Sequence, residues 1–349
     1  MTAASRPTIA DVARAAGVSK GLVSFALNGR PGVAADTRAR ILAAADDLGW
    51  TPSVRARSLS TGRSFACGLV IGRSPDVIAA DPFFPSFIAG VEDEFSTTGQ
   101  VLVLAVAAPG EEETEVYRTL AAGRRVDGVI LSDLRAADDR IALVEELGLA
   151  GVTLGVPDIR SPFSSVSIDD GAGVRAAVDH LVSLGHTRLA HIAGPSWMLH
   201  AAHRRAAFDD AVATAGIDAI VVETDFSAAQ GAAATEHLLD LDEAPTGIVY
   251  SNDQMAVAGL GVAQRRGIPV PAQLSLTGFD DTDIGRYLYP ALTSVATQAR
   301  LWGSRAARSL LDAVAGADPE EIALPSPTLI VRGSTGPAPH PPTRGSGRA

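Results

Sequence analysis

The chain has 349 residues, of which 46% are hydrophobic and 20% charged, a composition typical of a globular protein of two or three domains. Its only cysteine, Cys67, excludes a disulfide scaffold and any cysteine-built zinc or iron–sulfur site. The longest apolar run, Val101 to Pro109, is far shorter than the roughly 20 residues of a membrane span. The first residues also lack the apolar stretch of a signal peptide, so we expect a cytoplasmic protein without a membrane partner.

The net charge of −11 conceals an uneven distribution. The first 64 residues contain nine basic and four acidic residues, whereas the remainder contains 20 basic and 36 acidic ones. A basic head on an acidic body indicates an anion-binding module attached to a unit of different function. Arg-rich termini also arise by chance, so charge alone leaves nucleic-acid binding open.

Three short helices are predicted in the basic head. The first begins at Thr8, which forms a capping box with Asp11, the second begins after Ser19, and the third extends from about Asp36 to Leu48. Two short helices joined by a Gly-containing turn are typical of a helix-turn-helix unit whose core the third helix closes. A generic three-helix bundle would show the same pattern.

A further short helix is predicted in the linker that follows. Ser53 caps it, it continues through Leu59, and Thr61-Gly62 ends it. So short a helix is not stable alone in water. Either a partner stabilises it or the segment is a flexible tether.

From residue 66 onward, short apolar strands alternate with helices. Strands are expected at 66–71, 101–107, 128–131, 151–154, 189–193, 219–223, 247–250 and 274–278, and helices at 85–98, 113–124, 173–184 and 203–215. This alternation predicts parallel sheets covered on both faces. The strands are too many for one compact sheet, so we expect two similar subdomains with a cleft between them. Ligands of such folds bind beyond the carboxyl ends of the strands.

Several loops after strands contain candidate ligand residues. Phe83 and Phe84 suit stacking on a sugar or a base, or else they anchor the following helix. Trp197 offers another stacking surface. Two stretches, SNDQMA from Ser251 and GFDD from Gly278, supply polar groups, although Asn and Asp after strands also serve as caps and turn residues.

No catalytic constellation is visible, so we do not expect an enzyme. The neighbouring Asp280, Asp281 and Asp283 lack the spacing of a calcium loop. The histidines form no zinc-protease motif, and neither a glycine-rich phosphate loop nor a nucleophile elbow is present. We expect neither a metal nor a cofactor.

The segment TIADVARAAGVSKGLVSFALNGRPGV, followed by TRARILAAADDLGWTPSVRARSLSTGRS, resembles the amino-terminal domain of LacI-family transcription regulators. The resemblance continues at motif level to VRGST near residue 335. It implies a helix-turn-helix DNA-binding domain (1–52), a hinge helix and linker (53–63), and an effector-binding and dimerisation domain (64–335) of two α/β subdomains, similar to periplasmic sugar-binding proteins. The Pro-, Gly- and Arg-rich tail (336–349) is expected to be disordered.

In that family the second helix lies in the major groove. The resemblance places Lys20, Gly21 and Phe25 at base-reading positions. Phosphate contacts are implied for Ser19, Ser24 and Asn28. Phe25 stands where the family usually has Arg, so either the operator differs from the commonest family site or Phe25 belongs to the core.

The linker helix resembles the family's hinge helix, which forms when it pairs with its dimer mate on DNA. Ala56 and Leu59 match the residues that enter the minor groove, with Leu59 as the wedge between base pairs. A tether with Leu59 packed on the body is the competing interpretation.

The resemblance also implies effector contacts in the cleft. Arg204, Asn252 and Asp280 match the family's motifs, and Asp169-Asp170 match more weakly. His200 stands where many relatives have a small polar or basic contact, which leaves the identity of the effector open. The full expected set is Phe83, Phe84, Asp169, Trp197, His200, Arg204, Asn252 and Asp280.

These observations predict a dimeric, sequence-specific regulator that binds double-stranded operator DNA, a repressor controlled by a small effector such as a sugar. A solute-binding protein without a regulatory role would share the body but needs a signal peptide. A corepressor-dependent regulator that responds to a nucleobase-like ligand would fit the same pattern, as would an architectural DNA-binding protein without a ligand. The sequence does not decide whether the effector releases or recruits DNA.

Overall fold

The computed structural model describes residues 7–27, 32–51, 58 and 61–339. The chain divides into two compact units, Met1–Phe65 and Ala66–Ala349. Among the described residues, no helix is both long and apolar enough to cross a membrane.

The first unit contains the three predicted helices, α1 (Ile9–Ala16), α2 (Lys20–Leu27) and α3 (Ala35–Asp47). The backbone N–H of Thr8 donates to the Asp11 carboxylate at 3.0 Å, as the capping box requires. A small core joins the helices and consists of Val12, Ala13, Ala16, Val23, Ala26, Ile41 and Ala45. The helix-turn-helix prediction is therefore confirmed as a packed three-helix unit.

The second unit contains two six-stranded sheets. The first has the order β11-β5-β4-β3-β1-β2, from β1 (Ala66–Ile71), β2 (Val101–Val106), β3 (Gly128–Leu131), β4 (Ala150–Leu154), β5 (Ser164–Ser167) and β11 (Glu321–Ala323). The second has the order β12-β10-β9-β8-β6-β7, from β6 (Arg188–Ala193), β7 (Asp218–Glu223), β8 (Gly247–Tyr250), β9 (Ser275–Phe279), β10 (Thr293–Ala296) and β12 (Thr328–Ile330). All neighbours pair in parallel except β10 and β12. The two predicted parallel sheets are confirmed.

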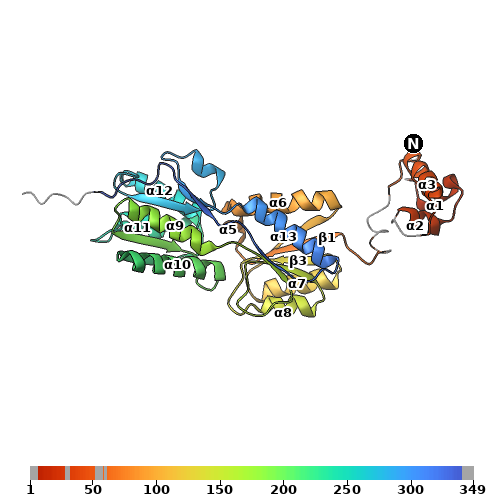
Figure 1. Ribbon diagram of the computed structural model, residues 1–349, viewed down its shortest axis with the longest axis horizontal. Helices are drawn as coiled ribbons and strands as arrows, with labels where there is room; N and C mark the ends of the chain where they lie inside the picture. The colour runs from red at the N-terminus through yellow and green to blue at the C-terminus, as the bar shows by residue number, and fades with distance from the viewer. Residues whose placement is uncertain (1–6, 28–31, 52–57, 59–60, 340–349) are drawn as a thin grey trace, which may run out of the picture. The chain divides into compact units, whose positions relative to one another are not determined.

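Helices cover both faces of each sheet (Figure 1). On the first sheet, α6 (Phe83–Thr98) and α13 (Ala299–Val314) share a core with Leu69 and Ile71, whereas α7 (Glu111–Ala122) and α8 (Asp139–Glu146) pack on Val70. Because alternate residues of a strand face opposite sides, these helix pairs lie on opposite faces. On the second sheet, α11 (Ala228–Leu239) and α12 (Asp253–Arg265) oppose α9 (Asp170–Ser183) and α10 (Leu199–Ala215). The short elements α5 (Pro75–Ala80) and η1 (Asp283–Arg286) complete the unit.

The chain passes between the sheets after β5, after β10 and between β11 and β12. The strands β5, β10, β11 and β12 have no counterpart among the predicted elements. They are only three or four residues long, and β5 and β10 are rich in buried serine and threonine, so none shows an apolar run.

The prediction of a disordered tail from residue 336 onward is wrong for its first residues. The Gly336 N–H donates to Ser275 Oγ at 3.1 Å, and the Ala338 N–H donates to the Leu184 carbonyl at 2.9 Å. Backbone hydrogen bonds therefore hold the chain to the second subdomain as far as Ala338. The last ten residues, 340–349, lie outside the described part.

Two glycines bring α6 and α13 into backbone contact. A Cβ added at Gly90 would lie 1.9 Å from the Arg300 carbonyl oxygen, and one at Gly303 would lie 2.0 Å from the Phe87 carbonyl oxygen. Both carbonyls belong to helix backbone, so neither can move without separating the helices. The side chains of Arg300 and Asp93 pair beside this contact at 2.7 Å.

Gly303→Ala should therefore destabilise the body by about 1–3 kcal/mol or more, the cost of overpacking. Gly261→Ala is a matched control, because Gly261 also lies inside a helix but its added Cβ would meet only the Arg265 side chain, at 3.5 Å. The control should be neutral or stabilising by about 0.5–1 kcal/mol. Urea unfolding of both variants measures this, and equal stabilities would contradict the close contact.

A buried histidine joins two strands of the second sheet close to the cleft. His191 Nδ1 donates to the Val249 carbonyl at 2.8 Å, which leaves Nε2 to accept from Ser251 Oγ at 3.3 Å. The side chain is fully buried, and burial lowers the pKa of His191 to about 4. The folded protein therefore holds this imidazole neutral at neutral pH.

Below pH 6.5, His191 binds a proton in the unfolded chain but not in the folded chain. The free energy of unfolding should therefore fall as the pH decreases from 6.5 to about 4. Each pH unit in this window costs about 1.4 kcal/mol. His191→Asn keeps a donor for the Val249 carbonyl without titrating, and its stability should depend less steeply on pH by that amount. An unchanged slope between pH 7 and pH 5 in urea unfolding would contradict the assignment.

Candidate functional site

The exposed face of α2 carries the predicted DNA-reading residues. Gly21 and Phe25 lie on the side of the helix opposite Val23, which is buried in the three-helix core, whereas Lys20 is exposed at the start of the helix and Ser24 is half-buried. Phe25 is 44% exposed and takes no part in that core, so the interpretation of Phe25 as a core residue is wrong.

Ser19 caps the start of α2, and Gly21 leaves the backbone of the helix accessible. Ser19 Oγ accepts the Leu22 N–H at 3.2 Å and so caps the helix. Gly21 has open space around it, because an added Cβ would meet only Ser19 Oγ at 3.9 Å. Packing does not require a glycine there, and a helix-interior glycine costs stability. The remaining expected DNA contacts, Asn28, Ala56 and Leu59, lie outside the described residues.

A pocket in the second unit lies between the two sheets, at the carboxyl ends of their strands. The first sheet contributes Arg73 after β1 and Ser132 and Asp133 after β3. The second contributes residues of α10 after β6 and Asp280 after β9. The full lining is Arg73, Asp81, Phe83, Phe84, Ser132, Asp133, Leu134, Leu154, Gly155, Val156, Ser167, Ile168, Asp170, Leu199, His200, His203, Arg204, Phe226, Asn252, Asp280 and Trp302.

Arg73 is held by two carboxylates. Its Nε and NH2 donate to both oxygens of Asp133 at 2.7 and 2.6 Å, and its NH1 donates to Asp81 at 3.3 Å. Burial alone would raise the pKa of Asp133, but the adjacent Arg73 outweighs it and lowers this pKa to about 2. The guanidinium carbon also lies 5.0 Å from the ring centre of Phe226, which belongs to the other subdomain.

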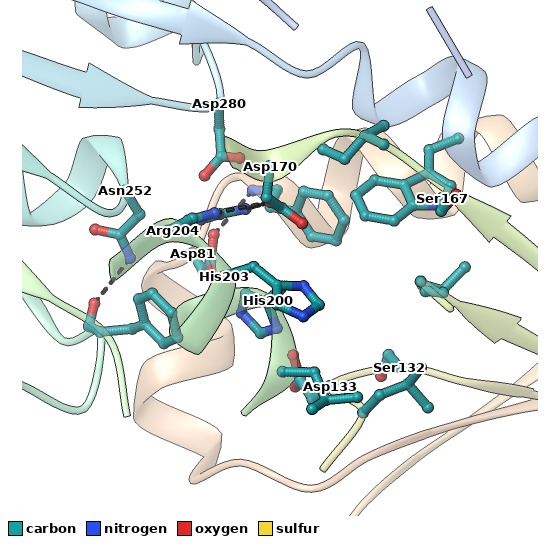
Figure 2. A pocket seen from close by; sticks show the side chains of 18 of the residues that line it. Asp81, Ser132, Asp133, Ser167, Asp170, His200, His203, Arg204, Asn252 and Asp280 are labelled. Carbon is teal, nitrogen blue, oxygen red and sulfur yellow. Dashed lines mark hydrogen bonds and ion pairs between the residues drawn. The ribbon is translucent and has the colours of Figure 1, made fainter. Parts of the chain in front are cut away.

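Arg204 is held within the second subdomain. Its Nε donates to Asp170 Oδ1 at 2.8 Å, and its NH2 forms an ion pair with the same oxygen at 2.7 Å (Figure 2). Its NH1 donates to the Ser251 carbonyl at 2.7 Å. The face of the guanidinium covers the Phe279 ring, with the guanidinium carbon 3.7 Å from the ring centre. The predicted effector arginine thus lines the pocket, with Asp170 rather than Asp169 beside it.

Three polar groups of the pocket have little or no protein partner. Among the described residues, the Asp280 carboxylate accepts a hydrogen bond only from Thr297 Oγ1, at the long distance of 3.5 Å, and burial raises the pKa of Asp280 well above its usual value. Ser132 Oγ is buried without a hydrogen-bond partner in the described part of the chain. Burial also lowers the pKa of His200 to about 3, so its imidazole is neutral. Ser132 is buried and the other two groups are half-buried, and polar groups that lack partners in such a pocket favour a ligand that supplies them.

Aromatic side chains form the apolar part of the pocket. Phe83 packs edge-on against Phe84 and Trp302, with ring centres 5.5 and 5.9 Å apart, and the His200 ring stacks on Phe226 at 5.5 Å. Phe84 is buried in the core below α6 and anchors that helix, and both rings line the pocket, so stacking on a ligand stays a prediction.

Three of the expected effector residues are placed differently from the rest. Asp169 caps α9, pairs with the exposed Arg175 at 3.3 Å and does not line the pocket. Trp197 is 42% exposed and lies outside the pocket, with Arg135 stacked over its ring at 5.5 Å. Asn252 does line the pocket, and its amide already makes two hydrogen bonds to the protein backbone.

Asn252 holds a neighbouring loop in place through two hydrogen bonds. Its Oδ1 accepts the Met255 N–H at 3.0 Å, and its Nδ2 donates to the Phe226 carbonyl at 3.0 Å. Asn252 therefore fixes the backbone that carries the stacking ring of Phe226.

Several polar residues of the pocket are absent from the full set expected from the sequence, among them Arg73, Asp81, Ser132, Asp133, Ser167 and His203. Ser132 and Asp133 directly follow β3, so the rule that ligands lie beyond strand ends would have found them. Asp81 precedes Phe83 and Phe84, and the aromatic residues are the more conspicuous signal of that loop.

Comparison with known proteins places this geometry in a family. Residues 8–53 match the model of bacterial regulatory proteins, lacI family, and residues 178–335 match a periplasmic binding protein-like domain. The chain is 34% identical over 337 residues to the HTH-type transcriptional regulator CelR of Thermobifida fusca, covering 94% of this chain and 98% of the relative. It is also 34% identical over 346 residues to the HTH-type transcriptional regulator MalR of Streptomyces coelicolor, covering 95% and 97%.

Solved structures agree over the same length. A CelR–cellobiose complex matches with a TM-score of 0.72 and 32% identity, covering 94% of this chain and 100% of that chain. A lac repressor dimer bound to operator and the anti-inducer ONPF matches with a TM-score of 0.80 and 27% identity, covering 95% and 100%. The chain belongs to the lacI family of bacterial regulatory proteins.

Proposed function

We propose that the protein is a transcriptional repressor whose binding to a specific DNA operator is controlled by a small sugar effector. The observation that carries this proposal is the presence, in one chain, of an exposed α2 face and a polar, aromatic pocket with unsatisfied hydrogen-bonding groups. DNA readout and ligand recognition occupy separate compact units, so a coupling between them is the regulatory step.

The first unit supports sequence-specific readout. A recognition helix contacts base edges with residues near its start, where Lys20 and Gly21 lie, and Phe25 is exposed one turn further along α2. Lysine donates to guanine, whereas phenylalanine contacts a thymine methyl group. Gly21 lets the backbone approach the groove closely.

Dimerisation is a second part of the proposal. The first sheet ends at β2, where Val101, Leu104 and Val106 are exposed. An apolar edge strand pairs readily with a second copy. In a dimer, two hinge segments would pair on the operator, with Ala56 and Leu59 in the minor groove. This prediction concerns residues that lie outside the described part of the chain.

Phe25→Arg should change which operator sequences are selected, because it replaces an apolar contact with a bidentate guanine contact worth about 1–3 kcal/mol. Selection of bound genomic fragments, followed by sequencing, measures the preference.

Leu42→Arg is the matched control, since Leu42 is 48% exposed on α3, away from the α2 face. It adds the same charge and should raise affinity for all sequences without changing the preference. Identical preferences for the two variants would contradict base reading by residue 25.

The pocket supports a sugar effector. Phe83, Phe226 and Trp302 supply rings that stack on the apolar faces of a pyranose, and Asp280 accepts hydrogen bonds from hydroxyl groups. One of the solved relatives is a complex with cellobiose, and another has bound ribose. An effector that spans the cleft would contact both subdomains and favour one arrangement of them. We propose that this arrangement releases the operator.

Asp280→Asn should weaken binding of the effector by roughly 2- to 10-fold, because a hydrogen bond lost from the carboxyl group is worth about 0.5–1.5 kcal/mol. Asparagine keeps the shape and tolerates the left-handed backbone, φ 108°, of this position. Calorimetry with cellobiose, maltose, lactose and ribose identifies the ligand and then compares the variants.

Asp169→Asn is the control, because this side chain lies outside the pocket and Asn also caps helices well. It should leave the affinity unchanged, and both variants should still bind the operator. Equal affinities for Asp280→Asn and the parent would place the effector elsewhere.

A further inference from the structure

We propose that this pocket accepts uncharged sugars and excludes phosphorylated and carboxylated ones, because carboxylates of the pocket itself already occupy both of its guanidinium groups. This inference depends on the proposed sugar effector and narrows its chemical class. Phosphate and carboxylate ligands are bound most strongly by a guanidinium that offers them a bidentate pair of N–H donors and whose charge no protein carboxylate already offsets. The pairing of Arg73 and Arg204 therefore decides which sugars can bind.

The positive charge of Arg73 is already offset by two carboxylates of the pocket, and three of its five N–H groups donate to them. All three of its nitrogens donate to carboxylates, two of them to Asp133 in a bidentate pair and the third to Asp81. Its two partners are themselves buried. Its guanidinium also lies against the rings of Phe84 and Phe226, 5.4 and 5.0 Å from their centres. An anionic ligand would have to displace Asp133.

The charge of Arg204 is also offset by a carboxylate of the pocket wall. Its Nε donates to Asp170, its NH2 forms an ion pair with the same carboxylate, its NH1 donates to the Ser251 carbonyl, and one face covers Phe279. The pair with Asp170 lies within the pocket wall, with side chains 8% and 10% exposed. Breaking such a pair leaves an uncompensated buried charge, which is strongly destabilising.

The remaining charges of the lining also disfavour an anion. Four carboxylates, Asp81, Asp133, Asp170 and Asp280, face two guanidinium groups. Even with Asp280 protonated, negative groups outnumber positive ones. The imidazole of His200 is neutral, and His203 is exposed, where water screens any charge.

The groups that remain available suit hydroxyl donors. The Asp280 carboxylate accepts, Ser132 Oγ both donates and accepts, and Oδ2 of Asp170 accepts no hydrogen bond from the described residues. A neutral polyol supplies donors to all three. A phosphate or carboxylate supplies only further acceptors and repels Asp280.

Calorimetry of the full chain with matched pairs tests this selectivity: cellobiose against cellobionate, ribose against ribose 5-phosphate, and glucose against glucose 6-phosphate. Within any pair that binds, we expect the neutral sugar to bind at least about tenfold more tightly. A tenfold difference in affinity corresponds to about 1.4 kcal/mol, and contacts between like charges cost more than that.

Asp133→Asn tests the role of the Arg73 pair, because it removes the bidentate carboxylate and leaves a residue that tolerates the left-handed φ of 51°. The preference for the neutral sugar should decrease by about tenfold or more. Asp81→Asn releases only the third hydrogen bond of Arg73 and should shift the preference less, in the same direction.

Asp139→Asn, an exposed position of α8, removes the same charge outside the pocket and should leave the preference unchanged. An anionic sugar that binds the parent protein as tightly as its neutral counterpart overturns this inference alone. So does an unchanged preference in folded Asp133→Asn and Asp81→Asn proteins. If neither half of the panel binds, the sugar effector of the proposed function fails, and this inference fails with it.

Discussion

Both sheets of the body point the carboxyl ends of their parallel strands at the same pocket, and the rest of the site depends on this constraint. Strand ends of both sheets place side chains in the pocket, so residues more than 200 positions apart, such as Arg73 and Asp280, line one cavity. Since the sheets belong to different subdomains, a ligand that contacts both sets of strand ends reports directly on how the subdomains are arranged. A binding site built in this way is also a sensor of conformation.

The pairing of arginines with carboxylates determines which groups of the pocket can bind a ligand. Burying Arg73 and Arg204 without partners would be costly, and the carboxylates that offset the cost are themselves members of the pocket wall. The pairing therefore leaves acceptors, hydroxyl groups and aromatic rings as the free recognition elements. Asn252, predicted as a ligand contact, lines the pocket and also holds the loop that carries Phe226. Part of the family motif thus works by holding the pocket in shape.

Much of the fold could be predicted from the sequence, because the apolar strands β1, β3, β6 and β8 and the capped helices of the head have strong local signals. The short strands could not, since β5 reads as Ser-Ser-Val-Ser and is defined by its neighbours rather than by its own pattern. The same limit applies to the site. Resemblance located Arg204 and Asp280, but the pairing of Arg73 with Asp133, 60 residues away, depends on tertiary structure. The prediction for Trp197 depends on its residue type alone, and this side chain lies outside the pocket.

In the proposed mechanism, ligand in the pocket and operator on α2 are linked through the body. Linkage is reciprocal, so an effector that weakens operator binding by some factor must itself bind more weakly to the operator complex by the same factor, typically about 5- to 150-fold. The most direct test measures the affinity of the bound sugar for the free protein and for the operator complex by calorimetry, and compares their ratio with the shift in operator affinity seen by fluorescence anisotropy. We expect equal ratios greater than one. Equal sugar affinities for the free and the DNA-bound protein would contradict the linkage.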